Sequence, residues 1–356
     1  MDRDELARLA LAVAVGAAGG LCFDLADLPA PWISGAMVAV AVAVLSGLKA
    51  RVDRRLRSGL FLFLGTSMGA GVTPDVLAGI GVWPASLVLL ATTVLATGAA
   101  THLFLRRLLG WDGASAFFAS IPGALSYVLV LAETSQADVP KVALSQTVRV
   151  FILVALLPSV VAALEAAPTA SGPVAAGIVA LQENASLADL VLMLLAGLAG
   201  GLAGERVGLP AGSLVGAFAA SAVLHGAGLV TGVLPAPLLA IGYVCLGTFI
   251  GLRFSGTRWI DLARGLASAV GAFVVGGGVA LAGAAAAALL LDLPFGQSII
   301  AFAPGGLEAM MILAFTLGFD PAYVAVHQLS RFLVMMIAVP ALARLVLGRD
   351  WNGRGR

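Results

Sequence analysis

The residues best suited to chemistry in this 356-residue chain are two Gln-x-x-Arg pairs, each set in a long apolar run. They are Gln146 with Arg149 and Gln328 with Arg331. Residues three apart share a helix face, so each Gln should point the same way as its Arg. A charged side chain in apolar surroundings is costly and usually faces a cavity or a partner. A planar guanidinium can hold a carboxylate through two hydrogen bonds, which predicts anion binding. The alternative is that each arginine satisfies nearby backbone carbonyls or pairs with an acid such as Glu308.

Each pair follows a Pro-Gly sequence that interrupts an apolar run, Pro122-Gly123 in one case and Pro304-Gly305 in the other. Proline removes a helical hydrogen bond and glycine relaxes the backbone, so a helix should break at both places. A break at membrane depth is tolerated where it lines a cavity, and the helix that follows presents free N–H groups there. The sequence therefore predicts a substrate site at the breaks. The residues expected to form it are Ser120, Pro122, Gly123, Ser126, Tyr127, Gln146, Arg149, Pro304, Gly305, Gly306, Glu308, His327, Gln328 and Arg331.

Two of these residues have no titratable counterpart in the first half of the chain. His327 corresponds to Ser145, and Glu308 corresponds to Ser126. A histidine can take up a proton near neutral pH and couple it to transport, or it can be a packing residue. Glu308 can bind a proton or a cation, although an acid in the first turn of a helix is also favoured by the helix dipole alone.

The two sites recur because the chain repeats itself at an offset of 182 residues. Residues that match at this offset are Gly65/Gly247, Gly69/Gly251, Pro122/Pro304, Gly123/Gly305, Asp138/Asp320, Gln146/Gln328, Arg149/Arg331 and Pro158/Pro340. Asp138 and Asp320 are expected to be helix N-caps, and the two Gly-x-x-x-Gly motifs are typical of close helix packing. The repeat predicts two membrane domains, 1–166 and 188–356, joined by an extracytoplasmic connector over 167–187.

Composition indicates an integral membrane protein. Hydrophobic residues make up 60% of the chain and charged residues 11%, and the mean hydropathy is +1.05. The net charge of +1 argues against a nucleic-acid partner. The sequence contains no P-loop, no nucleophile triad and no metal-ligand spacing, so we expect no catalytic residue, no metal and no cofactor.

We predict an all-α protein with two inverted repeats, each of five spans and one re-entrant hairpin. The expected spans are 9–23, 31–48, 59–73, 82–105, 141–165, 188–203, 212–229, 237–252, 265–290 and 323–346. Cytoplasmic loops are rich in Lys and Arg, and four basic regions fall on one side only if the Pro-Gly segments, 112–137 and 294–319, turn back. The alternative is that each segment is a kinked full span.

The Pro-Gly segments, each followed by a Gln-x-x-Arg span, resemble those of the bacterial AbrB membrane protein family over essentially the whole chain. That family is built of a duplicated membrane unit, and its members are often labelled transcriptional regulators or ammonia monooxygenases. The resemblance implies a multi-pass protein of the bacterial inner membrane. The plan of five spans and a hairpin is also similar to that of elevator carriers for organic anions, by analogy of fold.

The leading hypothesis is a secondary transporter, not an enzyme, that moves a small solute such as an organic anion by alternating access. Its expected partners are the solute, the lipid bilayer, H⁺ or Na⁺ as a coupling ion, and a second copy in a homodimer. The alternatives are a membrane regulator or scaffold without flux, and a monooxygenase-type membrane enzyme. Metal analysis would distinguish the enzyme.

Overall fold

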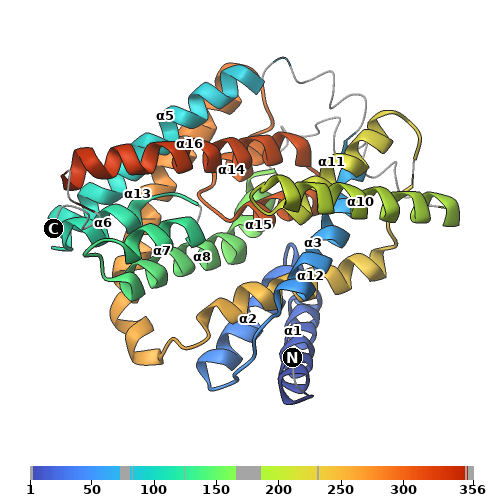
Figure 1. The fold of residues 1–356 in the computed structure, drawn as a ribbon, viewed down its shortest axis with the longest axis horizontal. Helices are drawn as coiled ribbons and strands as arrows, with labels where there is room; N and C mark the ends of the chain where they lie inside the picture. The colour runs from blue at the N-terminus through green and yellow to red at the C-terminus, as the bar shows by residue number, and fades with distance from the viewer. Residues whose placement is uncertain are drawn as a thin grey trace. The chain divides into compact units, whose positions relative to one another are not determined.

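The computed structural model describes residues 3–72, 81, 83–123, 125–165, 186–230, 232–348 and 351, without the side chains of residues 125, 126 and 165 (Figure 1). Every regular element among these residues is helical. The first half contains α1 (Arg3–Leu25), α2 (Pro31–Leu45), α3 (Arg54–Met68), η1 (Gly69–Gly71), α5 (Trp83–Leu103), η3 (Phe104–Leu108), α6 (Gly113–Ser120), α7 (Leu125–Glu133) and α8 (Val139–Glu165). The second half contains α10 (Leu187–Val207), α11 (Gly212–Gly226), α12 (Ala236–Gly251), η4 (Leu252–Phe254), α13 (Trp259–Leu291), α14 (Phe295–Phe302), α15 (Leu307–Thr316) and α16 (Pro321–Leu347).

Seven of these helices are long and apolar enough to cross a membrane. They are α1, α5 with η3, α8, α10, α12 with η4, α13 and α16. Three of the ten expected spans are shorter, because α2, α3 and α11 have 15 residues each. At about 1.5 Å per residue, such a helix is shorter than a hydrocarbon core of roughly 30 Å. The fold is therefore that of a multi-pass, all-helical membrane protein.

Helix ends recur at the spacing of the sequence matches. α6 and α14, like α8 and α16, begin and end 182 residues apart, and α2 and α11 do so at 181. The residues that precede α2 and α11, Ala30 and Ala211, both adopt a left-handed conformation, with φ of 51° and 48°. This conformation is uncommon for a residue with a Cβ, so its occurrence at matched positions is a specific likeness between the halves.

The chain forms two compact units, and each unit contains segments of both halves. Unit 1 consists of residues 1–81, 154–256 and 308–325, and it holds α1, α2, α3, α10, α11, α12 and α15. Unit 2 consists of residues 82–153, 257–307 and 326–356, and it holds α5, α6, α7, α13 and α14 with the first half of α8 and most of α16.

Glycine allows the helices of unit 1 to approach closely. A Cβ on Gly65 of α3 would collide with the carbonyl oxygen of Leu214 in α11, and a Cβ on Gly247 of α12 would collide with that of Ile33 in α2. The two Gly-x-x-x-Gly motifs thus mark close packing, as predicted. Each one packs on a helix of the other half, so α3 joins α10 and α11 whereas α12 joins α1 and α2.

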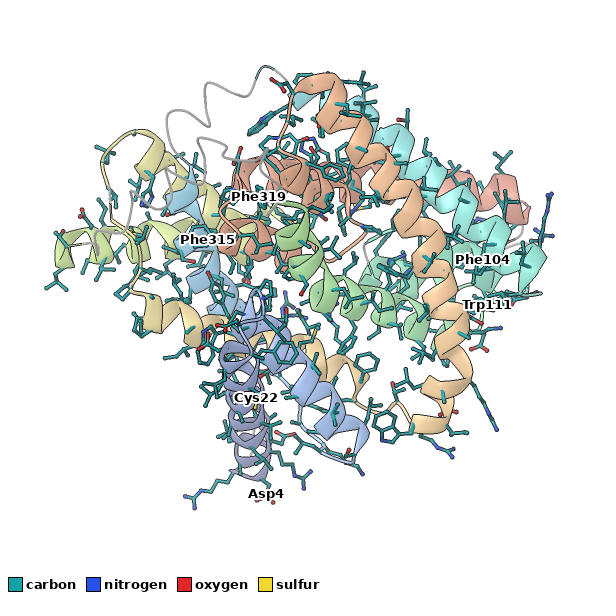
Figure 2. The ribbon with its side chains drawn as sticks, turned by 180° about the vertical axis from the view of Figure 1, so that it is seen from behind. Asp4, Cys22, Phe104, Trp111, Phe315 and Phe319 are labelled. Atoms are coloured by element: carbon teal, nitrogen blue, oxygen red, sulfur yellow. The ribbon has the colours of Figure 1, made fainter. Side chains whose placement is uncertain are left out.

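In unit 2, α5 packs along α13, its counterpart in the second half (Figure 1). Figure 2 shows Phe104, at the end of α5, beside α13, where its ring lies against Gly271. α6 packs on α5, and α14 packs on α13. Both Pro-Gly breaks thus lie in the unit built on these long helices, although most of α15, which follows the second break, belongs to unit 1.

Candidate functional site

Both Pro-Gly sequences separate two short helices. The first break lies between α6 and α7, and the second between α14 and α15. The residue before each proline is extended, Ile121 with ψ of 121° and Ala303 with ψ of 131°, because the proline ring disfavours the helical region for the preceding residue. Gly123 then adopts a φ of +85°, which glycine enters without steric cost. The chain is therefore broken where the sequence predicts it.

The pair on α8 binds the backbone at the end of α6. Gln146 donates from Nε2 to the carbonyl oxygen of Phe118 at 2.9 Å, and Arg149 donates from Nη2 to that of Ile121 at 3.2 Å. Arg149 Nη2 also donates to Gln146 Oε1 at 2.8 Å. The two side chains thus share a face, as their spacing predicts, and hold the carbonyls that α6 leaves without helical partners.

The pair on α16 does the same at the end of α14. Gln328 Nε2 donates to the carbonyl oxygen of Ile300 at 3.0 Å. Arg331 donates to the carbonyl oxygens of Ala303 and Gly305, the latter at 2.9 Å, and to Gln328 Oε1. Positive groups at the C-terminal end of a helix are favoured by its dipole. Each arginine therefore contacts the break of its own half and satisfies backbone carbonyls, which was one of the two predicted roles.

The two breaks meet at Arg331. A Cβ placed on Gly123 would lie 3.4 Å from Nε and 3.6 Å from Nη2 of Arg331, so the guanidinium rests against the backbone of the first break. The like charges of Arg149 and Arg331 are near enough to interact. Unit 2 therefore places both guanidinium groups at one locality, where a Cβ on residue 123 would be in van der Waals contact with Arg331.

These two charges are buried without a counter-charge among the described residues of their unit. Arg149 is 8% exposed and Arg331 is 3% exposed. Among the described residues of unit 2, no carboxylate pairs with either guanidinium. Nε of Arg149 is buried and has no hydrogen-bond partner among the residues described. An unpaired buried donor on a cation is unfavourable, so the locality has the capacity to bind an anion.

His327 is the third polar residue of α16 in this unit. It is fully buried, and its Nε2 lies 2.7 Å from the hydroxyl oxygen of Ser86 in α5. Its ring lies 6.1 Å from that of Phe302, the last residue of α14, between ring centroids. His327 thus links α16 to α5 and to the end of α14.

The remaining predicted residues have varied surroundings. Ser120 is buried and donates to the carbonyl oxygen of Phe117 in its own helix at 2.7 Å. Tyr127 donates to the carbonyl oxygen of Met336 in α16 at 2.9 Å, so its hydroxyl has a backbone partner. Pro122, Pro304 and Gly305 are buried, and Gly123 and Gly306 are partly buried. Glu308 lies in the first turn of α15 and belongs to unit 1, and the side chain of Ser126 lies outside the described residues.

The sequence offered backbone carbonyls as one of two possible kinds of partner for the arginines, but it did not identify the individual partners of these side chains. Most are backbone carbonyls, which no residue type reveals. Ser86 is different, because it is a small polar residue in an apolar helix and matches Ser268 at the offset of the repeat. Over the described ranges, no three His, Cys, Asp or Glu residues are grouped as metal ligands.

Comparison with known proteins shows the family of this chain. A family model described as "Transition state regulatory protein AbrB" matches residues 32–347. The chain belongs to the AbrB family. The resemblance predicted from the sequence is thereby confirmed.

Two relatives align along nearly their whole length with this AbrB-family chain. The first, from Escherichia coli (strain K12), is named "Putative regulator AbrB" and is 26% identical over 334 residues, which cover 90% of each chain. The second, from Bacillus subtilis (strain 168), is named "Uncharacterized protein YhjN" and is 25% identical over 94% of this chain and 92% of its own. The whole membrane unit is therefore shared.

Proposed function

We propose that this AbrB-family protein is a secondary transporter of a small organic anion in the bacterial inner membrane, with ion or proton coupling. One observation carries the proposal: two buried guanidinium groups lie at the two helix breaks, and no carboxylate in the described part of their own unit neutralises them. Leaving a charge unpaired in a low-dielectric interior costs several kcal/mol. A carboxylate between Arg149 and Arg331 would offset that cost.

The two arginines also have hydrogen-bond donors that could bind an anion. Arg149 and Arg331 each use part of their hydrogen-bonding capacity on break carbonyls, which fixes their positions. A guanidinium has five N–H donors in a rigid fork. Nε of Arg149 has no partner within the described part of the protein. An anion would bind to arginines that are already oriented, which limits the entropy lost on binding.

Inverted repeats are a common basis of alternating access, and two hydrogen bonds in unit 1 support them here. The hydroxyl of Ser58, at the start of α3, donates to Oε1 of Glu205, at the end of α10, at 2.7 Å. The hydroxyl of Ser255, after η4, donates to the carbonyl oxygen of Ala50, before α3, at 3.5 Å. Two residues at the ends of membrane helices that are hydrogen-bonded to each other lie on the same side of the membrane. The chain between them must therefore cross it an even number of times.

The even number of membrane crossings favours re-entrant hairpins at the Pro-Gly segments. Four predicted spans separate Ser58 from Glu205, namely α3, α5, α8 and α10, which supports a first Pro-Gly segment that adds no crossing. A further contact, of Leu347 at the end of α16 against Gly113 before the first break, requires that the two Pro-Gly segments behave alike. We therefore propose two hairpins that enter from opposite faces. Unit 2 would carry the anion in an elevator-like motion.

Replacement of each arginine by lysine tests the anion site. Lysine keeps the charge and loses the planar fork. We expect Arg149→Lys and Arg331→Lys each to weaken anion binding by at least tenfold. The measurement is the rise in melting temperature of the purified protein with formate, acetate, pyruvate or succinate, since a ligand of the native state stabilises it. Uptake of the same anion into proteoliposomes then tests transport.

The matched control is Arg258→Lys, an exposed arginine before α13. It should leave both the melting temperature and the ligand-induced rise unchanged. If both site variants fold and keep the full ligand-induced rise, the arginines serve the backbone alone and the anion site is refuted. If the wild-type protein responds to no anion and shows no uptake, the transport proposal fails as a whole.

The description of the matching family and the name of the Escherichia coli relative favour a second candidate, a membrane regulator without flux. Such a protein needs a stable partner. Affinity purification from the native membrane distinguishes the two functions: a stoichiometric partner together with absent uptake would favour regulation.

A further inference from the structure

We propose that the anion carried by this protein is a short dicarboxylate, and that Arg149 and Arg331 each bind one of its two carboxylates. This inference rests on the proposed function and narrows it to one class of substrate. Three features of unit 2 carry it: the number of buried charges at the helix breaks, the donors that each guanidinium leaves free, and the places where the two groups are held.

The first feature is the charge of the site. Arg149 and Arg331 donate to backbone carbonyl oxygens and to the amide oxygen of a glutamine, and all of these acceptors are uncharged. Such acceptors orient a cation without cancelling its charge. A monoanion would offset one of the two charges and leave the other buried and unpaired, which is unfavourable. A dianion offsets both.

The second feature is the free donors. A guanidinium has five N–H groups. Arg149 uses Nη2 for Ile121 and Gln146, so its Nε and Nη1 have no partner among the described residues. Arg331 uses Nη1 and Nη2 for the second break and for Gln328, and its Nε is the atom closest to the position of a Cβ on Gly123. Each arginine can therefore donate to an acceptor of its own.

The third feature is that the two guanidinium groups are held at two points of the first break. Arg149 donates to the carbonyl oxygen of Ile121, whereas Arg331 lies against Gly123, two residues later. Consecutive Cα atoms are about 3.8 Å apart, so these two backbone positions are less than roughly 8 Å apart. Neither arginine can move to a common point without loss of its bonds to break carbonyls. Two carboxylates on a short chain fit this arrangement better than two charges on one centre.

Ligand pairs that differ in one charge test the inference. Both carboxylates of succinate are ionised at pH 7.5, and succinamate has a neutral amide in place of one of them. We expect wild-type protein to bind succinate at least about tenfold more tightly than succinamate, because a close charge pair is lost. Malonate and malonamate form a second pair with a shorter chain. Sulfate, whose two charges share one centre, should bind more weakly than the better dicarboxylate. Affinities are measured by titration calorimetry of the purified protein at constant ionic strength, since salt screens charges.

Removal of one arginine should abolish the preference for the dicarboxylate. Arg149→Gln and Arg331→Gln each leave one cation, so the ratio of the two affinities should fall to about threefold or less. Arg149→Lys and Arg331→Lys keep both charges and should keep the ratio, although both ligands bind more weakly. Arg258→Gln, outside the site, should keep both the ratio and the affinities. If a glutamine variant does not fold, the ligand pairs on wild-type protein decide the question.

The outcomes separate this inference from the proposed function. Equal affinities within both ligand pairs overturn the inference, because one carboxylate would then suffice, and they leave an anion carrier standing. Sulfate bound as tightly as the better dicarboxylate also overturns it, since two separate ends would not matter. So do folded glutamine variants that keep the full ratio. Failure of the wild type to bind any anion refutes the proposed function, and the substrate class falls with it.

Discussion

At the scale of single residues, the sequence singled out the side chains that contact the helix breaks and offered backbone carbonyls as one possible partner, but it did not show which carbonyls they bind. A Gln and an Arg three residues apart in an apolar helix must share a face, and the structure has Gln146 and Arg149 hydrogen-bonded to each other. Their other partners are backbone carbonyls at the end of α6, which any residue type could supply. The contact of Arg331 with Gly123 joins the two halves of the chain and could not be read from either half alone.

That contact leads to a prediction for Gly123→Ala. An alanine at this φ of +85° is strained by about 1–2 kcal/mol, and its Cβ would lie in van der Waals contact with the guanidinium of Arg331, where it would cover part of the surface that an anion would approach. We expect a lower melting temperature and, in addition, a loss of anion binding of tenfold or more. Both are measured in one thermal-shift titration with the anions named above.

Gly110→Ala is the control for backbone strain. Gly110 has a φ of +64°, and among the described residues no atom lies within 4 Å of the position that a Cβ would take there. The substitution should lower the melting temperature and leave anion binding intact. Equal ligand responses in Gly110→Ala and Gly123→Ala would show that the contact with Arg331 has no part in binding.

At the scale of helices, the sequence located the elements well because apolar periodicity, prolines and caps are local signals. α16 begins at Pro321 with Asp320 as its N-cap, whose Oδ1 accepts from the backbone N–H of Ala322 at 2.8 Å. Lengths were less well predicted: α2 and α11 end at Leu45 and Gly226. The glycine-containing turns that end these helices lie inside apolar runs that continue for several residues, so hydropathy places the helix ends too late.

The N-caps of α8 and α16 differ in burial, which leads to a pH prediction. Asp138 is exposed whereas Asp320 is buried, and burial raises the pKa of the Asp320 carboxyl to about 6 from 3.8. A carboxyl whose pKa is raised on folding contributes most to stability when protonated. That contribution is complete below about pH 4 and is lost as the pH rises through about 6.

Asp320→Asn should therefore stabilise the protein near neutral pH, on the order of 2 kcal/mol, because asparagine also caps a helix and bears no charge. The measurement is the melting temperature from pH 4 to 8, in which the fall between pH 4 and 6 should become shallower. Asp138→Asn is the matched cap and should leave the profile unchanged. A profile for Asp320→Asn parallel to that of the wild type would contradict the burial argument.

At the scale of the whole molecule, the two halves are interleaved. α3 packs with α10 and α11 of the second half, and α12 packs with α1 and α2 of the first. Matched residues at offsets of 181 and 182 indicated a duplication. No pattern in the sequence shows that α3 and α12 are exchanged, that is, that each packs on helices of the other half. The exchange follows from close approach at Gly65 and Gly247, which is known only once the partner backbones are placed.

The exchange makes the membrane topology testable, because it brings loops of the two halves together. Ser255 bonds to the backbone of Ala50, so the basic loops near Arg51 and Arg258 should lie on the same face. The positive-inside rule makes that face cytoplasmic. The connector over 167–187, which lies outside the described residues except for Ser186 and Leu187, should be on the opposite face.

Single cysteines at Arg51, Ser171 and Arg258 test this, in a background where Cys22 and Cys245 are replaced by alanine. In intact cells, an impermeant thiol reagent should label Ser171→Cys alone, whereas Arg51→Cys and Arg258→Cys should react only after the membrane is opened. Two parallel repeats of six full spans would instead place Arg51 and Arg258 on opposite faces, since the first Pro-Gly segment would add a crossing between them. Labelling of Arg258→Cys but not Arg51→Cys in intact cells would therefore exclude the hairpins, and with them the symmetry on which alternating access depends.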